Sequence, residues 1–270
     1  MKIFIVSLIR AKDRREYIKA HLGSLSLEYE IIDAVDYLEL TPADYERLTD
    51  EEAVRKNPFL SKGSIACSLS HLQIYRRMVQ DDIGMSLVLE DDAHLPHNIK
   101  QLLAAVEADI QYNEVITLSY FNHHESKPVT QLSKEGRTPL RGGGELVYPI
   151  DLHDIASTMA YVITKSVAEK MIDILMPISV QTDYWGVYYD KGAFDSFRCL
   201  YPVPVRAALV RSSIDYEAGK TLISRLAAVI RKYNVPVLVS YLNRRAGKMQ
   251  EQKYFFDFVE GKPFTQRVPE

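Results

Sequence analysis

Short apolar runs alternate with amphipathic stretches along most of the chain, and this alternation constrains the fold more than any other feature. Ile3–Leu8, Met85–Leu89 and Met159–Ile163 are nearly continuous apolar runs, as is typical of strands buried on both faces of a sheet. Between them, Lys62–Val79 places apolar residues at helical spacing. The alternation predicts an α/β domain with a single Rossmann-type, mostly parallel sheet flanked by helices.

Weaker patterns extend this outline. Further strands are expected at Glu28–Ala34 and Val115–Leu118, and further helices after Thr41 and at Ser166–Leu175. The stretch from Tyr120 to Glu145 is polar and ends in three glycines, so we expect a mobile loop near the functional site, in which His123 and His124 are solvated.

The C-terminal part differs from the rest. Between Lys220 and Lys248 the chain has seven basic residues and no acidic one, interleaved with apolar residues at helical spacing. We therefore expect a domain over residues 1–215 and a basic amphipathic helical extension over residues 216–270. Such a segment suits an anionic membrane surface, and packing against an acidic protein body is the alternative.

Bulk properties narrow the function classes. The net charge is −3 and the pI is near 6.2, so the sequence predicts no nucleic-acid partner. Cys67 and Cys199 are isolated among apolar neighbours, which favours buried, reduced thiols. The sequence contains neither a signal-peptide pattern nor an apolar run long enough for a membrane span. We expect a cytoplasmic protein, located at the inner face of the membrane if the basic segment docks there.

Three consecutive acids, Glu90, Asp91 and Asp92, follow the apolar run Met85–Leu89. Like charges repel one another unless a cation or solvent relieves the repulsion. A divalent metal with oxygen ligands is one such relief, and it could bridge a diphosphate. A solvated acidic turn is the alternative, and the triplet alone does not decide between the two.

Basic residues follow the first predicted strand at Arg10, Lys12, Arg14 and Arg15. Guanidinium groups suit phosphate oxygens or a flat base, although a solvated helix start also explains the pattern. In parallel sheets, ligands bind in a crevice beyond the carboxyl ends of the strands. We therefore expect the end of the first strand and the acidic triplet to face one crevice.

Two further segments combine residue types that suit sugar or nucleotide sites. Ser70 and His71 lie inside the predicted helix that opens at residue 62; a packed or surface histidine is the alternative. Asp183, Tyr184 and Trp185 join one acid to two aromatic rings. An exposed ring could stack on a pyranose, and a turn around a core tryptophan is the alternative.

Several of these blocks resemble glycosyltransferase family 25, the lipopolysaccharide and lipooligosaccharide glycosyltransferases. The blocks are Ile5–Leu8 with Asp13–Arg15, Ile31–Asp36, Ile65–His71, Val88–Ala93, Thr158–Thr164 with Ala168–Glu169, and Asp183. They follow the family's order over residues 1–210. Two positions depart from it, because Ala66 replaces a glycine of the helix motif and Ser157 stands where the family usually has glycine.

The resemblance implies a GT-A-like fold and a metal-dependent, inverting transfer of a hexose from a UDP-sugar donor, with Mn²⁺ or Mg²⁺. It favours galactose over glucose, and a lipooligosaccharide, lipopolysaccharide or other surface glycan as the glycolipid or oligosaccharide acceptor. Asp92 would bind the metal directly, with Glu90 or a water completing the shell; Asp91 would contact the ribose, and Asp183 would be the base. The remaining site residues would be Ser7, Arg10, Arg14, Ser70 and His71 for the donor nucleotide, and Tyr184 and Trp185 for the acceptor.

Two other functions fit parts of the pattern. A metal-dependent nucleotidyl or phosphoryl transferase also needs paired carboxylates, but Gly142–Gly144 follows a polar stretch rather than a strand, which is the wrong place for a phosphate loop. A non-catalytic, membrane-associated carbohydrate-binding protein is the second alternative. The acids at Glu90, Asp92 and Asp183 argue against it.

Overall fold

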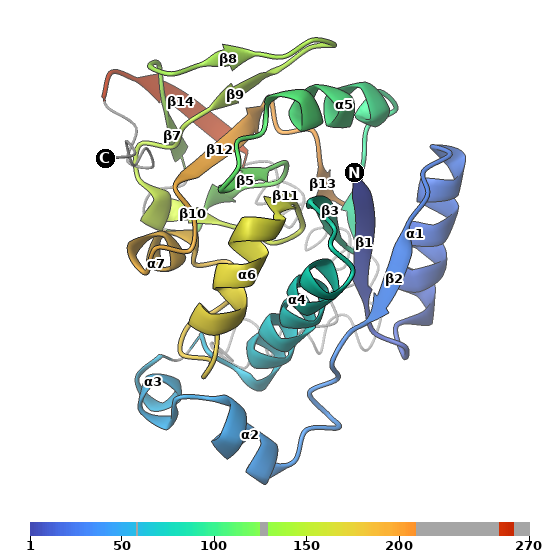
Figure 1. Cartoon of the computed structure of the whole chain (residues 1–270), viewed down its shortest axis with the longest axis vertical. Coiled ribbons are helices and arrows are strands. Elements are labelled where there is room, and N and C mark those ends of the chain that lie inside the picture. The colour runs from blue at the N-terminus through green and yellow to red at the C-terminus, as the bar shows by residue number, and fades with distance from the viewer. Residues whose placement is uncertain (58, 125–128, 209–253, 262–270) are drawn as a thin grey trace, which may run out of the picture.

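The computed structural model describes residues 1–57, 59–124, 129–208 and 254–261, and its centre is an eight-stranded sheet (Figure 1). The spatial order is β2 (Glu30–Asp33), β1 (Lys2–Ser7), β3 (Met85–Glu90), β11 (Ala160–Thr164), β5 (Glu114–Thr117), β12 (Ser196–Tyr201), β9 (Glu145–Val147) and β8 (Thr138–Pro139). Strands β11 and β9 run against the others. The sheet is therefore mostly parallel, as predicted.

Helices cover both faces of the sheet and make three layers (Figure 1). They are α1 (Lys12–Ser24), α2 (Pro42–Leu48), α3 (Glu51–Lys56), α4 (Lys62–Gln80), α5 (Ile99–Asp109), α6 (Lys165–Ile174) and α7 (Trp185–Asp190). Because side chains alternate along a strand, Phe4 and Val6 of β1 pack into the core with α4, α6 and α7, while Ile3 and Ile5 pack with α1 and α5.

Two helix starts agree closely with their sequences. Thr41 caps α2 through a reciprocal capping box with Asp44, and Pro42 occupies the first turn, which agrees with the helix predicted after Thr41. Ser61 caps the long helix α4. This helix buries Ile65, Leu72 and further apolar residues at the expected spacing.

The stretch from Tyr120 to Glu145 is more ordered than the predicted mobile loop. In its described part it contributes β6 (Phe121–Asn122), β7 (Val129–Ser133) and β8. Strand β6 pairs with β10 (Ile155–Ala156), which follows the short 3-10 helix η1 (Leu152–Asp154), and β8 pairs with β9. Positive φ angles at Gly142, Gly143 and Gly144 make the turn between β8 and β9. The prediction of a loop was wrong because short edge strands leave little periodic signal.

Two further strand pairs involve segments from the C-terminal part of the described chain. Strand β14 (Phe255–Val259) pairs in parallel with β7, and β13 (Arg206–Ala207) pairs with β4 (Ala93–His94). The predicted boundary at residue 215 and the basic segment 220–248 lie outside the described residues. Among the helices that are described, none has the length and apolar character needed to cross a bilayer.

Candidate functional site

A cleft of about 500 Å³ lies where β1 and β3 end. The two strands run parallel with Val6 opposite Glu90, so their carboxyl ends meet at one edge of the sheet. The cleft is lined by residues from both strand ends, from α4, and from the loops before β11 and α7. The volume falls in the range of small-molecule sites. The expectation that both strand ends face one crevice is confirmed.

Asp91 is the most firmly held acid of the cleft. Its carboxylate accepts a hydrogen bond from the Ser7 hydroxyl at 2.7 Å and forms an ion pair with Arg14 at 2.5 Å. Arg14 also reaches Asp92 at 3.0 Å. A single guanidinium from α1 therefore links two adjacent acids, and part of their mutual repulsion is neutralised within the chain.

The negative charges of Glu90 and Asp92 are less well compensated by neighbouring groups than that of Asp91. Burial raises the pKa of Glu90 to about 7, the neighbouring Asp92 adds to the rise, and a hydrogen bond from Thr158 at 2.7 Å opposes it. Burial also raises the pKa of Asp92, against the effect of Arg14. The Oδ1 atom of Asp92 is buried and has no hydrogen-bond partner among the described residues. Such an atom requires an explanation, and a bound cation is one.

Asp183 and Tyr184 approach the cleft from the loop before α7. Asp183 is half-buried, and burial raises its carboxyl pKa. The ring of Tyr184 stacks on His123, with 5.5 Å between ring centroids and 23° between planes. His123 also lines the cleft. This side of the cleft therefore joins a carboxylate to two stacked rings, a combination that suits a sugar hydroxyl and the apolar face of a pyranose.

Ser70 lines the cleft but its hydroxyl is already engaged. It accepts a hydrogen bond from the Val35 amide at 2.9 Å and donates one to the Ala66 carbonyl at 2.7 Å. Ser70 thus ties α4 to the backbone after β2, where Ala34 and Val35 form part of the cleft wall. The structure supports a positioning role for Ser70 more directly than a contact with a nucleotide.

Three residues predicted from the sequence do not line the cleft, and burial rules out the predicted contacts of His71 and Trp185. Arg10 does not line the cleft, because its guanidinium pairs with Asp36 and lies 5.8 Å from the Tyr37 ring centroid. His71 is fully buried beneath the cleft wall and cannot touch a nucleotide. Trp185 is also fully buried; its indole donates to the Ser157 carbonyl at 3.1 Å, so it is a core residue rather than a stacking platform.

Three cleft residues were missed by sequence reasoning. Thr158 orients Glu90, His123 stacks on Tyr184, and Cys67 lines the cleft half-buried rather than within the core. Burial raises the pKa of the Cys67 thiol, and Glu90 and Asp183 raise it further. Only the spacing on α4 could have indicated Cys67, since it lies on the same helix face as Ser70 and His71.

Comparison with known proteins places this α/β chain, with its carboxylate-lined cleft, among the glycosyltransferases. The sequence profile of glycosyltransferase family 25, the LPS biosynthesis proteins, matches residues 1–185. The chain belongs to this family.

Curated relatives share only part of their length with the chain. The inactive glycosyltransferase 25 family member 3 of Homo sapiens is 27% identical over 177 residues, which cover 63% of this chain and 28% of the human protein. Procollagen galactosyltransferase 2 of Mus musculus is 30% identical over 114 residues, which cover 40% of this chain and 18% of the mouse protein. The chain thus spans less than a third of either relative, and the family contains both transferases and members named as inactive.

Proposed function

We propose that this chain transfers a hexose, galactose in preference to glucose, from a UDP-sugar to a lipooligosaccharide, lipopolysaccharide or other surface-glycan acceptor, with inversion at the anomeric carbon. Membership of family 25 supports transfer of a sugar, and the galactosyltransferase names among its relatives favour galactose. The observation that carries the proposal is the convergence of Glu90, Asp91, Asp92 and Asp183 on one cleft.

The residues present fit a hard divalent cation. Asp92 offers a buried oxygen without a hydrogen-bond partner among the described residues, Glu90 lies in the same cleft, and carboxylate oxygens are the ligands that Mg²⁺ and Mn²⁺ prefer. In the proposal, Asp92 and Glu90 hold the ion. When bound, it would neutralise the charge that grows on the UDP leaving group.

The chain's own groups account for the other steps. Asp91, fixed by Ser7 and Arg14, would accept hydrogen bonds from the ribose hydroxyls. Asp183 would take the proton of the acceptor hydroxyl. As it does so, the acceptor oxygen would bond to the anomeric carbon, and the bond from that carbon to UDP would break on the opposite face. The raised pKa of Asp183 suits this role, because a base works best when its pKa lies close to the working pH.

The acceptor contact belongs to the pair His123 and Tyr184 rather than to Trp185. Both rings line the cleft beside Asp183, and a pyranose stacked there would place a hydroxyl near the proposed base. Trp185 is buried in the core, whereas the rings of His123 and Tyr184 line the cleft.

Two substitutions test the proposal through release of UDP from UDP-galactose with an oligosaccharide acceptor. Asp92→Asn should abolish metal-dependent turnover, because it removes a proposed ion ligand. Asp183→Asn should retain UDP binding and lose at least about a hundredfold in turnover, the usual contribution of a general base. Asp173→Asn, on the exposed side of α6, is the matched control and should behave as the unchanged protein. Normal turnover by Asp183→Asn would refute the base assignment.

Relatives named as inactive favour one alternative, a carbohydrate-binding protein without turnover. It predicts binding of UDP-sugar or glycan with no UDP released, even by slow hydrolysis. Acting on UDP-galactose, a nucleotidyl transferase would instead transfer the uridylyl group and release galactose 1-phosphate, and a transferase of the sugar phosphate would release UMP. Product analysis of one reaction with UDP-galactose and Mn²⁺ separates all three functions.

We also propose that the basic segment 220–248 docks on the anionic cytoplasmic leaflet of a membrane, where glycolipid acceptors lie. Seven basic residues interleaved with apolar ones support this, since each Lys or Arg near such a surface contributes about 1 kcal/mol of attraction. Packing of the segment on the acidic body is the alternative.

A further inference from the structure

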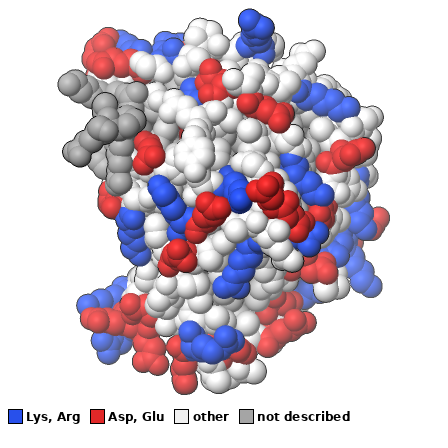
Figure 2. Space-filling view, viewed as in Figure 1, with Lys and Arg blue, Asp and Glu red and all other residues white. Residues whose placement is uncertain are grey.

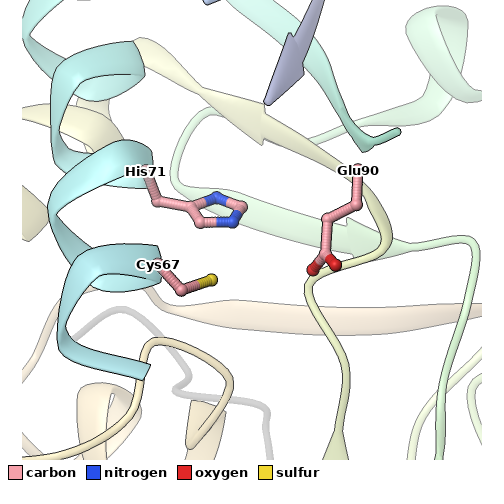
Figure 3. A group of neighbouring side chains, drawn as sticks. All are labelled: Cys67, His71 and Glu90. Atoms are coloured by element: carbon pink, nitrogen blue, oxygen red, sulfur yellow. The ribbon is translucent and has the colours of Figure 1, made fainter. Parts of the chain in front are cut away.

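A second group of potential ligands combines Glu90 of the acidic triplet with a thiol and an imidazole from α4, and two of its three members line the cleft. Cys67, His71 and Glu90 each place one ligand atom within 4.8 Å of the others (Figure 3). Cys67 and His71 are one turn apart on α4, so their side chains leave the same face of the helix. Glu90 points toward them from the end of β3 (Figure 3).

His71 supplies the strongest sign of a binding site there. Its Nδ1 atom lies 2.7 Å from the Tyr161 hydroxyl, which in turn lies 2.9 Å from the Tyr75 hydroxyl. Its Nε2 atom is fully buried and has no hydrogen-bond partner among the described residues. A buried polar atom without a partner is destabilising, so its presence calls for an explanation. When Nδ1 donates to Tyr161, Nε2 presents its lone pair to the cluster, which is how outer partners orient metal-binding histidines.

We propose that Cys67, His71 and Glu90 form a binding site for Zn²⁺ or a similar soft divalent ion, separate in chemistry from the Mg²⁺ or Mn²⁺ site of the proposed function. A thiolate, an imidazole and a carboxylate are the ligand set that zinc takes, whereas magnesium and manganese favour oxygen alone. A thiolate and a carboxylate together balance the charge of the ion, so the occupied site is neutral and can lie partly buried.

The geometry needs only a small adjustment. Ligand atoms around a tetrahedral zinc lie about 3.5 Å apart, given bonds of about 2.0–2.3 Å. The observed spacing of up to 4.8 Å therefore closes by roughly 1 Å, which rotation of the Glu90 and Cys67 side chains can supply. Thr158 already holds one Glu90 oxygen at 2.7 Å. Since Cys67 and Glu90 line the cleft while His71 does not, a fourth position would open toward the cleft.

Sharing of Glu90 has a consequence for the transferase. An ion held by Cys67 and His71 would draw Glu90 away from Asp92, so zinc would compete with the ion that the proposed function requires. This inference goes beyond that function, because the site can bind zinc whether or not the chain transfers a sugar.

Cobalt spectroscopy on the full chain tests the site without reference to activity. Co²⁺ added to metal-free protein should produce a thiolate-to-cobalt charge-transfer band, and Zn²⁺ should abolish the band where equal Mn²⁺ does not. Cys67→Ser should lose the band and weaken Zn²⁺ binding at least about a hundredfold, because loss of an outer partner alone commonly costs 10–100-fold. Cys199→Ser is the matched control: it changes the other, fully buried thiol and should keep the band.

Two further measurements keep the test decisive. In the unsubstituted protein, Zn²⁺ should slow alkylation of Cys67 as read by mass spectrometry, which needs no folded variant. Asp92→Asn should keep the cobalt band while losing Mn²⁺-dependent UDP binding, which separates this site from the proposed catalytic one. A missing band in the unsubstituted protein, a band retained by Cys67→Ser, or equal loss in Cys199→Ser would each overturn the proposal.

Discussion

Ser157 has a left-handed backbone conformation in the wall of the cleft, with φ at 118°. Such a conformation costs a residue with a side chain about 1–3 kcal/mol, while glycine adopts it freely. Ser157→Gly and Ser157→Ala both lose the side-chain hydroxyl, but only glycine relieves the strain, so Ser157→Gly should be more stable than Ser157→Ala by about 1 kcal/mol in urea unfolding. Ser157→Ala keeps Cβ and loses the hydrogen bond from the Met159 amide, so it should stabilise nothing. Equal effects of the two variants would show that backbone strain is not the cause.

Single residues were predictable where their chemistry depended on position along a strand. Asp91 and Asp92 come directly after a continuous apolar run, and the residues at the carboxyl end of a parallel strand reach the crevice. The burial of Trp185 and His71 was not predictable in the same way. A single aromatic or imidazole side chain gives the same sequence pattern whether it packs in the core or contacts a ligand. The burial of both residues depends on contacts with Tyr161, which is distant in sequence.

At the scale of elements, one buried arginine with two acidic partners joins α5, β5 and β12. Arg198 donates to both oxygens of Glu114 at 2.6 and 2.8 Å and to Asp109 at 2.6 Å. Arg198→Met would leave the fully buried Glu114 carboxylate without its cation, and loss of one partner of such a pair costs about 3–5 kcal/mol. Chemical denaturation should show this loss, with a smaller one for Arg198→Met combined with Glu114→Leu.

The control for this pair is an exposed one. Lys56 and Glu52 lie 2.5 Å apart on α3, with both side chains largely in solvent. Lys56→Met should change stability by no more than about 0.5 kcal/mol. If the double variant at Arg198 and Glu114 proved less stable than Arg198→Met alone, an uncompensated buried charge would not explain the loss.

The elements themselves were predictable to different degrees. β1, β3 and α4 combine length with a clear period, so sequence alone located them. The direction of β11 was not predictable, because an apolar run gives the same sequence pattern whether the strand is parallel or antiparallel to its neighbours. β12 was missed since Ser196 and Arg198 interrupt its apolar pattern; both are hydrogen-bonded to Glu114, which is distant in sequence, and Arg198 is also bonded to Asp109.

At the scale of the whole molecule, the distribution of charge between the basic segment 220–248 and the rest of the chain determines what the segment can bind. Figure 2 shows acidic and basic side chains interspersed over one face of the described residues. The net charge is −3 although residues 220–248 hold seven basic residues and no acid, so the rest of the chain is acidic. The segment can therefore pair with anionic lipid or with its own body. Sedimentation with anionic vesicles should recover more protein than sedimentation with neutral vesicles, and less at high salt. Equal recovery with both would refute docking.

Strand β14 joins the last described segment of the chain to β7, with which it pairs in parallel. Phe256 meets Tyr120 and Tyr201 edge to face, with ring centroids 5.2 and 5.8 Å apart. Phe256→Ala should destabilise the fold by about 2 kcal/mol, less than the 3–5 kcal/mol of a fully buried phenylalanine because this ring is half-buried. Its neighbour Phe255 is 54% exposed, so Phe255→Ala is the matched control and should change stability by about 0.5 kcal/mol at most. Thermal unfolding of both variants decides the question: equal midpoints would mean that β14 adds nothing to the stability of the body, whereas a shift in Phe256→Ala alone would make residues 254–261 part of the folded domain.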